Sequence, residues 1–199
     1  MLGTGSMARL LRGVVAVLIV AATIQAYGPN LFFFFTILSN TLAVALLGGQ
    51  ALRPRWMGSN GLFRGGVTLY MTITGLVYAV LLAPLDIDVG AYAPWANYVH
   101  HTLAPAVVLI DWLLFPPLRK LDRQAPWIWL VFPAVYFVFS LIRGSITGWF
   151  PYPFLNLDEL GAGGVALYSI VILGFFAGIG WFIRWWADER GVIPESGTT

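Results

Sequence analysis

The stretch from Pro126 to Thr147 reads PWIWLVFPAVYFVFSLIRGSIT and contains one charged side chain, that of Arg143. A helix crosses the hydrocarbon layer of a bilayer with about 20 consecutive apolar residues. Pro126 suits the first turn of such a helix, where its missing N–H costs no hydrogen bond. This stretch therefore predicts a transmembrane helix with a single cation inside it.

Five more apolar stretches of similar length flank this one, each bounded by polar, proline or glycine residues. We expect them to span the membrane at residues 10–27, 31–52, 65–83, 95–115 and 163–186. The 199-residue chain is 59% hydrophobic and only 10% charged, which is too little charge to cover the surface of a soluble domain. The predicted fold class is an all-α integral membrane protein with six transmembrane helices.

The basic residues predict the orientation of the bundle. Ten of the eleven lysines and arginines lie in segments on one side of the predicted membrane. The loops on the other side carry acidic residues, namely Asp86, Asp88, Asp158 and Glu159. Because cytoplasmic loops are enriched in Lys and Arg, both termini are expected in the cytoplasm. A composition rich in Gly, Ala, Arg and Trp suggests the plasma membrane of a bacterium.

The ends and the charges inside the chain carry further expectations. Residues 1–6 resemble a vector-derived leader before Met7, residues 7–190 form one transmembrane domain, and residues 191–199 are expected to be a disordered tail.

Arg64 is expected to precede the third span. Asp111, near the cytoplasmic end of the fourth, is expected to pair with Arg119 or Lys120.

Three polar side chains on different predicted helices fall at nearly one depth. Thr36, His101 and Arg143 each lie roughly 6 to 9 Å from the extracytoplasmic end of their helix, at a rise of about 1.5 Å per residue. Polar groups are costly inside hydrocarbon, so their convergence is a signal of function. Taken singly each has a structural explanation, because threonines bond their own i−4 carbonyl, histidines pack in cores and arginines reach toward headgroups.

Helical periodicity adds more polar groups to the same faces. Residues four positions apart share a face of a helix, which places Asn40 beside Thr36 and Asn97 beside His101. The fifth span carries a polar stripe of Tyr136, Ser140, Arg143 and Thr147. Pro105 cannot donate to the carbonyl of His101, so a kink with a free acceptor is expected there. Together these stripes predict a polar pocket that opens toward the outer leaflet.

Three motifs at these positions resemble one known family. They are FTILSN at residues 35–40, NYVHHT at residues 97–102 and TGWFPYPF at residues 147–154. They are similar to the signatures of the androgen-induced-protein family, which includes the androgen-dependent regulator of tissue factor pathway inhibitor. The resemblance covers all six spans, and the shorter bacterial members match best, including the Arg143-Gly144 pair before the third motif.

The resemblance implies a hydrolase with a threonine nucleophile and a histidine base. The vertebrate members cleave fatty-acid esters of hydroxy fatty acids. Carried over by motif, the nucleophile is Thr36 and the base is His101, whereas His100 points about 100° away on a helix. The vertebrate pattern lacks a basic residue around Arg143, so the ester cleaved here can differ.

The remaining roles stay open at the level of sequence. Candidates for lining the pocket, stabilising an oxyanion or orienting the histidine are Asn40, Asn97, Tyr136, Ser140 and Arg143. We expect no cofactor, no metal and no nucleic-acid partner, because the chain has no cysteine, its two histidines are adjacent and its basic residues form no stripe. The absence of a Gly-x-Ser-x-Gly motif disfavours the common serine hydrolases.

The predicted function is an intramembrane lipid esterase. Burial favours a neutral His101 that can accept a proton from Thr36. The alternative is a non-catalytic protein, or a transporter, that binds a lipid or small molecule in the same pocket; a haem or metal site is a weaker rival.

Overall fold

The computed structural model describes residues 4–26, 28, 30–53, 60–85, 93–117 and 119–190, and these residues are helical with no strands. The α-helices are α1 (Thr4–Gln25), α2 (Phe35–Leu52), α4 (Gly61–Val77), α5 (Pro94–Tyr98), α6 (Ala104–Leu114), α7 (Ala125–Thr147) and α8 (Leu157–Arg190). Short 3-10 turns are η1 (Leu31–Phe33), η3 (Ala83–Leu85) and η5 (Pro153–Leu155), and π-turns are η2 (Tyr78–Leu82) and η4 (Val99–Leu103). The expected tail at residues 191–199 lies outside the described residues.

Five helical segments of the described chain are long and apolar enough to cross a membrane. They are Gly5–Gln25, Phe35–Leu52, Gly61–Leu82, Ala125–Thr147 and Leu157–Arg190. The stretch expected at residues 95–115 is helical from Pro94 to Leu114, but the π-turn η4 divides it into α5 and α6. It is therefore not one long α-helix, and it is not among the five candidate spans of the described residues.

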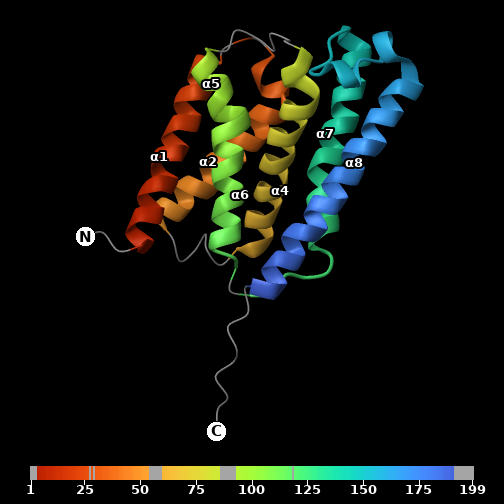
Figure 1. Ribbon diagram of the computed structural model, residues 1–199. Helices are drawn as coiled ribbons and strands as arrows, with labels where there is room; N and C mark the ends of the chain where they lie inside the picture. The colour runs from red at the N-terminus through yellow and green to blue at the C-terminus, as the bar shows by residue number, and fades with distance from the viewer. Residues whose placement is uncertain are drawn as a thin grey trace.

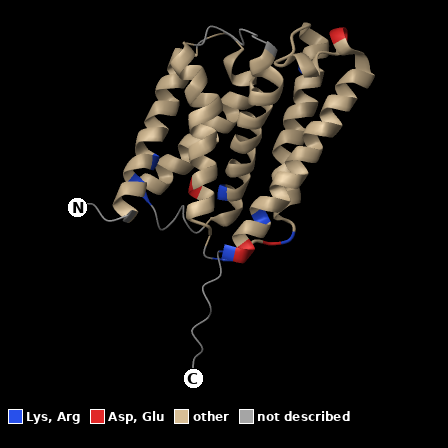
Figure 2. Ribbon diagram, in the orientation of Figure 1, with Lys and Arg blue, Asp and Glu red and all other residues tan. Residues whose placement is uncertain are grey.

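The long helices lie side by side as a bundle (Figure 1). α1 begins and α8 ends at the same end of this bundle. Most of the described Lys and Arg gather at this end (Figure 2). At the opposite end, the described charges include Asp158 and Glu159 in the first turn of α8.

Two apolar cores hold the helices together. One core joins α1, α2, α4 and α6 through residues such as Ile19, Leu47 and Met71, whose side chains are completely buried. The other joins α4 to α7 and α8 through Leu69, Trp129 and other large side chains. α4 contributes to both, so the α7–α8 pair docks onto the rest of the bundle mainly through α4.

The third span begins earlier than expected. α4 starts at Gly61, and the side chain of Asn60 caps it by accepting a hydrogen bond from the Phe63 N–H at 3.1 Å. Arg64 therefore lies inside the first turn, where it is 3% exposed, and not in a connecting segment. The expectation for Arg64 was wrong because the capping asparagine extends the helix by one turn.

Asp111 pairs with arginines of other helices. Its carboxylate bonds Arg12 of α1 at 2.6 Å and Arg64 of α4 at 3.4 Å. The expected partners, Arg119 and Lys120, were wrong, because the packing of α1 and α4 against α6 places their cations closer. This buried trio ties three helices together near the end of the bundle where the basic residues gather.

The segment between α7 and α8 folds back over the bundle. Gly148 ends α7 in the left-handed conformation, with φ of 68°, which favours glycine. Gly144 lies one turn before Gly148, and the ring of Phe150 packs on it so tightly that a Cβ added at Gly144 would lie 2.1 Å from that ring. These two glycines aim residues 149–156 toward α2.

Candidate functional site

Thr36 differs from eight other helical hydroxyls in its hydrogen bonds. Eight side-chain hydroxyls donate to the carbonyl four residues earlier, and these are Thr23, Ser39, Thr41, Thr68, Thr72, Thr74, Thr147 and Ser169. The Thr36 hydroxyl instead lies 3.2 Å from Nε2 of His101 and 3.3 Å from the hydroxyl of Tyr152. The structure thus directs this hydroxyl to two side chains of other segments.

The second ring nitrogen of His101 decides what Nε2 can do. Nδ1 lies 3.1 Å from the backbone carbonyl oxygen of Asn97, and a carbonyl can only accept. Nδ1 therefore carries the proton, which leaves Nε2 of a neutral ring as an acceptor for the Thr36 hydroxyl. This is the arrangement that a general base needs beside a hydroxyl nucleophile.

His101 lies where the helix departs from α-helical geometry, and Tyr78 and Asn97 fix its ring. It lies in the π-turn η4, and π-turns are common at functional sites. The ring of Tyr78 stacks on the imidazole with centroids 4.2 Å apart and planes 17° apart. The side chain of Asn97 donates to the Tyr78 hydroxyl at 2.7 Å. Asn97 therefore orients His101 twice, with its main-chain carbonyl and through Tyr78.

Two tyrosines satisfy the first N–H groups of α2. The hydroxyl of Tyr136 accepts from the Phe35 N–H, and that of Tyr152 accepts from the Thr36 N–H, both at 3.2 Å. These N–H groups have no partner within their own helix. Burial raises the pKa of Tyr152, so its phenol remains a hydrogen-bond donor at neutral pH.

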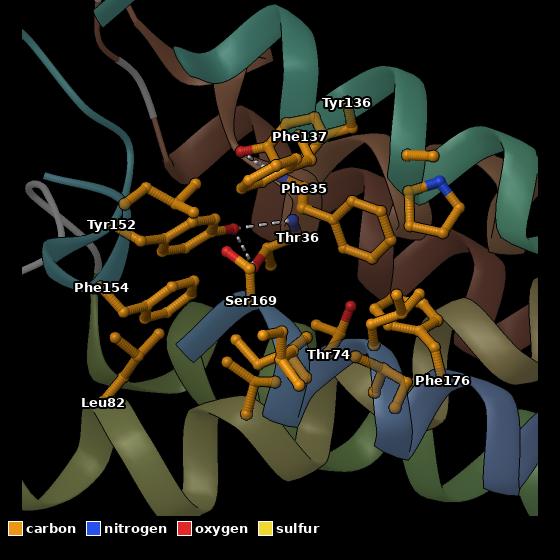
Figure 3. A pocket seen from close by; sticks show the side chains of 18 residues that line it. Phe35, Thr36, Thr74, Leu82, Tyr136, Phe137, Tyr152, Phe154, Ser169 and Phe176 are labelled. Carbon is orange, nitrogen blue, oxygen red and sulfur yellow. Dashed lines mark hydrogen bonds between the residues drawn. The ribbon is translucent and has the colours of Figure 1, made fainter. Parts of the chain in front are cut away.

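A cavity of about 260 Å³ begins at this point and extends between α2, α4, α7 and α8 (Figure 3). Thr36 and Tyr152 lie at its polar end, and Figure 3 shows the Tyr152 phenol pointing toward Thr36. No charged residue is among the described residues that line it. The wall includes Ile170 and Leu173, which are 68% and 53% exposed on the outside of α8. Apolar side chains that border the cavity thus also reach the exterior of the bundle.

Three other expected site residues have different surroundings. The amide of Asn40 donates to the carbonyls of Thr36 and His100, at 2.9 and 3.2 Å, so it joins α2 to the π-turn. Arg143 bonds the side chain of Asn30 at 2.8 Å, and its guanidinium stacks on aromatic rings outside the cavity. Ser140 is buried one turn from Tyr136 but does not line the cavity.

Sequence reasoning missed two residues of this site. Tyr78 had no signal beyond its place in an apolar stretch, because its stacking depends on the two π-turns η2 and η4. Tyr152 stood inside a quoted motif, and the tyrosine between two prolines was the signal that could have singled it out.

The arrangement can move a proton from a threonine hydroxyl to an imidazole at the wall of an apolar cavity. Among the described residues, no three His, Cys, Asp or Glu side chains gather where they could hold a metal ion. Comparison of the chain with known protein families, with curated proteins and with solved structures finds no match.

Proposed function

We propose that this protein is a membrane-embedded lipid esterase, related to the androgen-induced-protein family, in which Thr36 is the nucleophile and His101 the base. The observation that carries the proposal is the 3.2 Å contact of the Thr36 hydroxyl with Nε2 of a His101 whose Nδ1 faces a carbonyl. The uncharged cavity beside Thr36 suits an acyl chain. Fatty-acid esters, such as esters of hydroxy fatty acids, are the proposed substrates.

We also propose that the protein crosses the plasma membrane of a bacterium six times, with both termini in the cytoplasm. The helical stretch from Pro94 to Leu114 is the sixth span, because it is long enough and packs among the others. The basic end of the bundle faces the cytoplasm by the positive-inside rule. Thr36, at the start of α2, then lies toward the outer leaflet.

In the first half of the reaction, the Thr36 oxygen bonds to the acyl carbon of the ester while its proton passes to Nε2 of His101. The carbonyl oxygen becomes an oxyanion. When the tetrahedral intermediate collapses, the bond to the alcohol oxygen breaks and that oxygen takes the proton from His101. The products are an acyl ester on Thr36 and a free alcohol.

In the second half, His101 removes a proton from a water molecule, whose oxygen bonds to the same acyl carbon. Collapse of this intermediate breaks the bond to Thr36, and His101 returns the proton to the threonine oxygen. The net reaction consumes one ester and one water and yields one acid and one alcohol. Throughout, Asn97 and Tyr78 hold the imidazole in one orientation.

The test is ester hydrolysis and fluorophosphonate labelling by the purified full-length protein, with fatty-acid esters of several chain lengths. Thr36→Ala and His101→Ala are each expected to lower turnover by at least about a thousandfold, because each removes one member of a pair that acts as a unit. Thr41→Ala is the matched control on the same helix, since that threonine bonds only its own helix. Its turnover is expected to equal that of the unaltered chain.

Hydrolysis that survives in Thr36→Ala would overturn the proposal. The second candidate is a protein that binds a lipid in the cavity without cleaving it, and the uncharged lining favours it equally. Mass spectrometry of the purified protein separates the two. Intact esters retained together with an absence of turnover and labelling support binding alone.

A further inference from the structure

The hydroxyl groups that line the cavity differ in whether their hydrogen is already used. Five lining residues carry a hydroxyl, and these are Thr36, Thr74, Tyr136, Tyr152 and Ser169. Three of them donate to backbone carbonyls: Thr74 to Tyr70 at 2.9 Å, Tyr136 to Phe33 at 2.9 Å and Ser169 to Val165 at 2.7 Å. The hydrogen of Thr36 is the one that the proposed base removes.

This leaves the hydroxyl of Tyr152. Its oxygen accepts the Thr36 N–H at 3.2 Å, so its own hydrogen points elsewhere, and the Thr36 hydroxyl at 3.3 Å is an acceptor within reach. The phenol is 7% exposed, its ring is stacked on Phe154 with planes 6° apart, and it meets Phe34 edge to face. It is thus a fixed donor whose hydrogen can be released to another acceptor beside Thr36.

Hydrolysis of an ester needs such a donor. When the Thr36 oxygen bonds to the acyl carbon, the carbonyl oxygen one bond further away gains a negative charge. Donors fixed beside that position stabilise the transition state, because they need no reorientation when the charge forms. Of the donors expected from sequence, the amide of Asn40 is bound to two carbonyls, and Arg143 does not line the cavity.

We propose that Tyr152 is a catalytic residue that donates a hydrogen bond to the oxyanion formed at Thr36; this rests on the proposed esterase function. In the resting site its hydrogen bonds the threonine oxygen. During attack that oxygen gives its electron pair to the acyl carbon and becomes a poorer acceptor, so the hydrogen turns to the oxyanion. The Thr36 N–H, at the positive end of α2, polarises the phenol and strengthens it as a donor.

The experiment compares Tyr152→Phe with the unaltered protein in two measurements. The first is steady-state hydrolysis of a fatty-acid ester. We expect kcat to fall by on the order of 100-fold to 1,000-fold, as for other single oxyanion donors, with KM within about threefold. The second is the affinity of a long-chain trifluoromethyl ketone, which forms a tetrahedral adduct with the nucleophile. The affinity of Tyr152→Phe for this ketone is expected to fall by the same factor as kcat/KM.

Two controls separate this role from a structural one. Tyr136→Phe also removes a phenol that accepts an N–H of the first turn of α2, but its hydrogen is bound to Phe33. For Tyr136→Phe we expect a loss of thermal stability comparable to that of Tyr152→Phe. Its affinity for the ketone should fall by less than tenfold. Tyr70→Phe removes a buried phenol that donates to Trp129, away from the cavity, and is expected to retain full turnover.

The outcomes distinguish this inference from the esterase proposal. If Thr36→Ala abolishes hydrolysis while Tyr152→Phe behaves like Tyr136→Phe, the esterase stands and the role of Tyr152 is overturned. If the unaltered protein neither cleaves esters nor binds the ketone, both fall. Should Tyr152→Phe fail to fold, 3-fluorotyrosine at position 152 keeps both bonds and makes the phenol more acidic. Ketone affinity and kcat are then expected to rise together, and no change in either overturns the inference.

Discussion

Two buried polar clusters occupy opposite ends of this bundle, and they differ in charge. One consists of Asp111, Arg12 and Arg64, which join α6, α1 and α4 near the end where the chain begins. The other is neutral and contains Thr36, His101 and the groups that contact them. Only the neutral cluster borders the cavity.

The difference teaches what each cluster can do. In the charged cluster both carboxylate oxygens of Asp111 face a guanidinium, so its bonds are committed to holding helices together. In the neutral cluster the hydroxyl of Thr36 has two alternative partners, and a change of partner costs little. Chemistry requires groups that can exchange hydrogen bonds, whereas anchoring requires groups that cannot.

Breaking the charged cluster is expected to give the largest effect on stability. Asp111→Ala leaves the buried Arg64 and the partly buried Arg12 without a counter-charge, which costs about 3–5 kcal/mol. The measurement is the free energy of unfolding of the full-length protein in detergent micelles. The ester turnover of the fraction that remains folded should stay within about twofold, since Asp111 does not border the cavity.

The matched control for this change is Asp188→Ala. Asp188 pairs with Arg184 at 2.9 Å within one helix and accepts the Leu121 N–H at 3.2 Å, but it is more exposed, so its loss should cost less, about 1–2 kcal/mol. Equal costs for the two variants would show that the Asp111 cluster is not an anchor.

Hydropathy was sufficient to predict the long helices, because burial in hydrocarbon demands uninterrupted apolar residues. It also placed Thr36 and His101 at one depth on separate helices, and the structure brings them within 3.2 Å. What it could not supply was the partner of each polar group. Asp111 was assigned to cations near it in sequence, whereas Arg12 is 99 residues away and reaches it through helix packing.

The orientation of His101 was beyond prediction for a related reason. Two π-turns place Tyr78 over the imidazole, and a π-turn depends on backbone hydrogen bonds that no residue type marks reliably. Asn97 was a candidate from sequence for orienting His101; its carbonyl makes the contact with Nδ1, and its amide holds Tyr78. Residue identity alone does not distinguish these two uses.

Removing a hydrogen bond from the neutral cluster should lower kcat more than it lowers the free energy of unfolding. Asn97→Ala retains the carbonyl that bonds Nδ1 but removes the hydrogen bond to Tyr78, so the stacked ring no longer fixes the imidazole. We expect kcat to fall by up to about 100-fold, because small displacements of a base are costly. Tyr78→Phe removes the same bond from the other side and should have a similar effect.

Steady-state kinetics of the double variant check this assignment. Because both changes delete one hydrogen bond, combining Asn97→Ala with Tyr78→Phe should lower kcat little further than either alone. Effects that multiply would mean that the two residues act on His101 independently, contrary to the geometry of the site.

The smallest expected effect concerns the apolar end of the cavity, where the site meets the exterior of the bundle. Ala134 of α7 lines the cavity and is exposed on the outside of the helix, so Ala134→Trp can narrow the cavity without overpacking the core. The rate for long-chain esters relative to short ones should fall about tenfold, near the selectivity that a few methylene groups give an apolar pocket. Val135 is the matched control, because it is 63% exposed and does not line the cavity. If Val135→Trp shifts the chain-length preference as much as Ala134→Trp, the acyl chain does not lie in this cavity, and the neutral cluster must meet its substrate from another side.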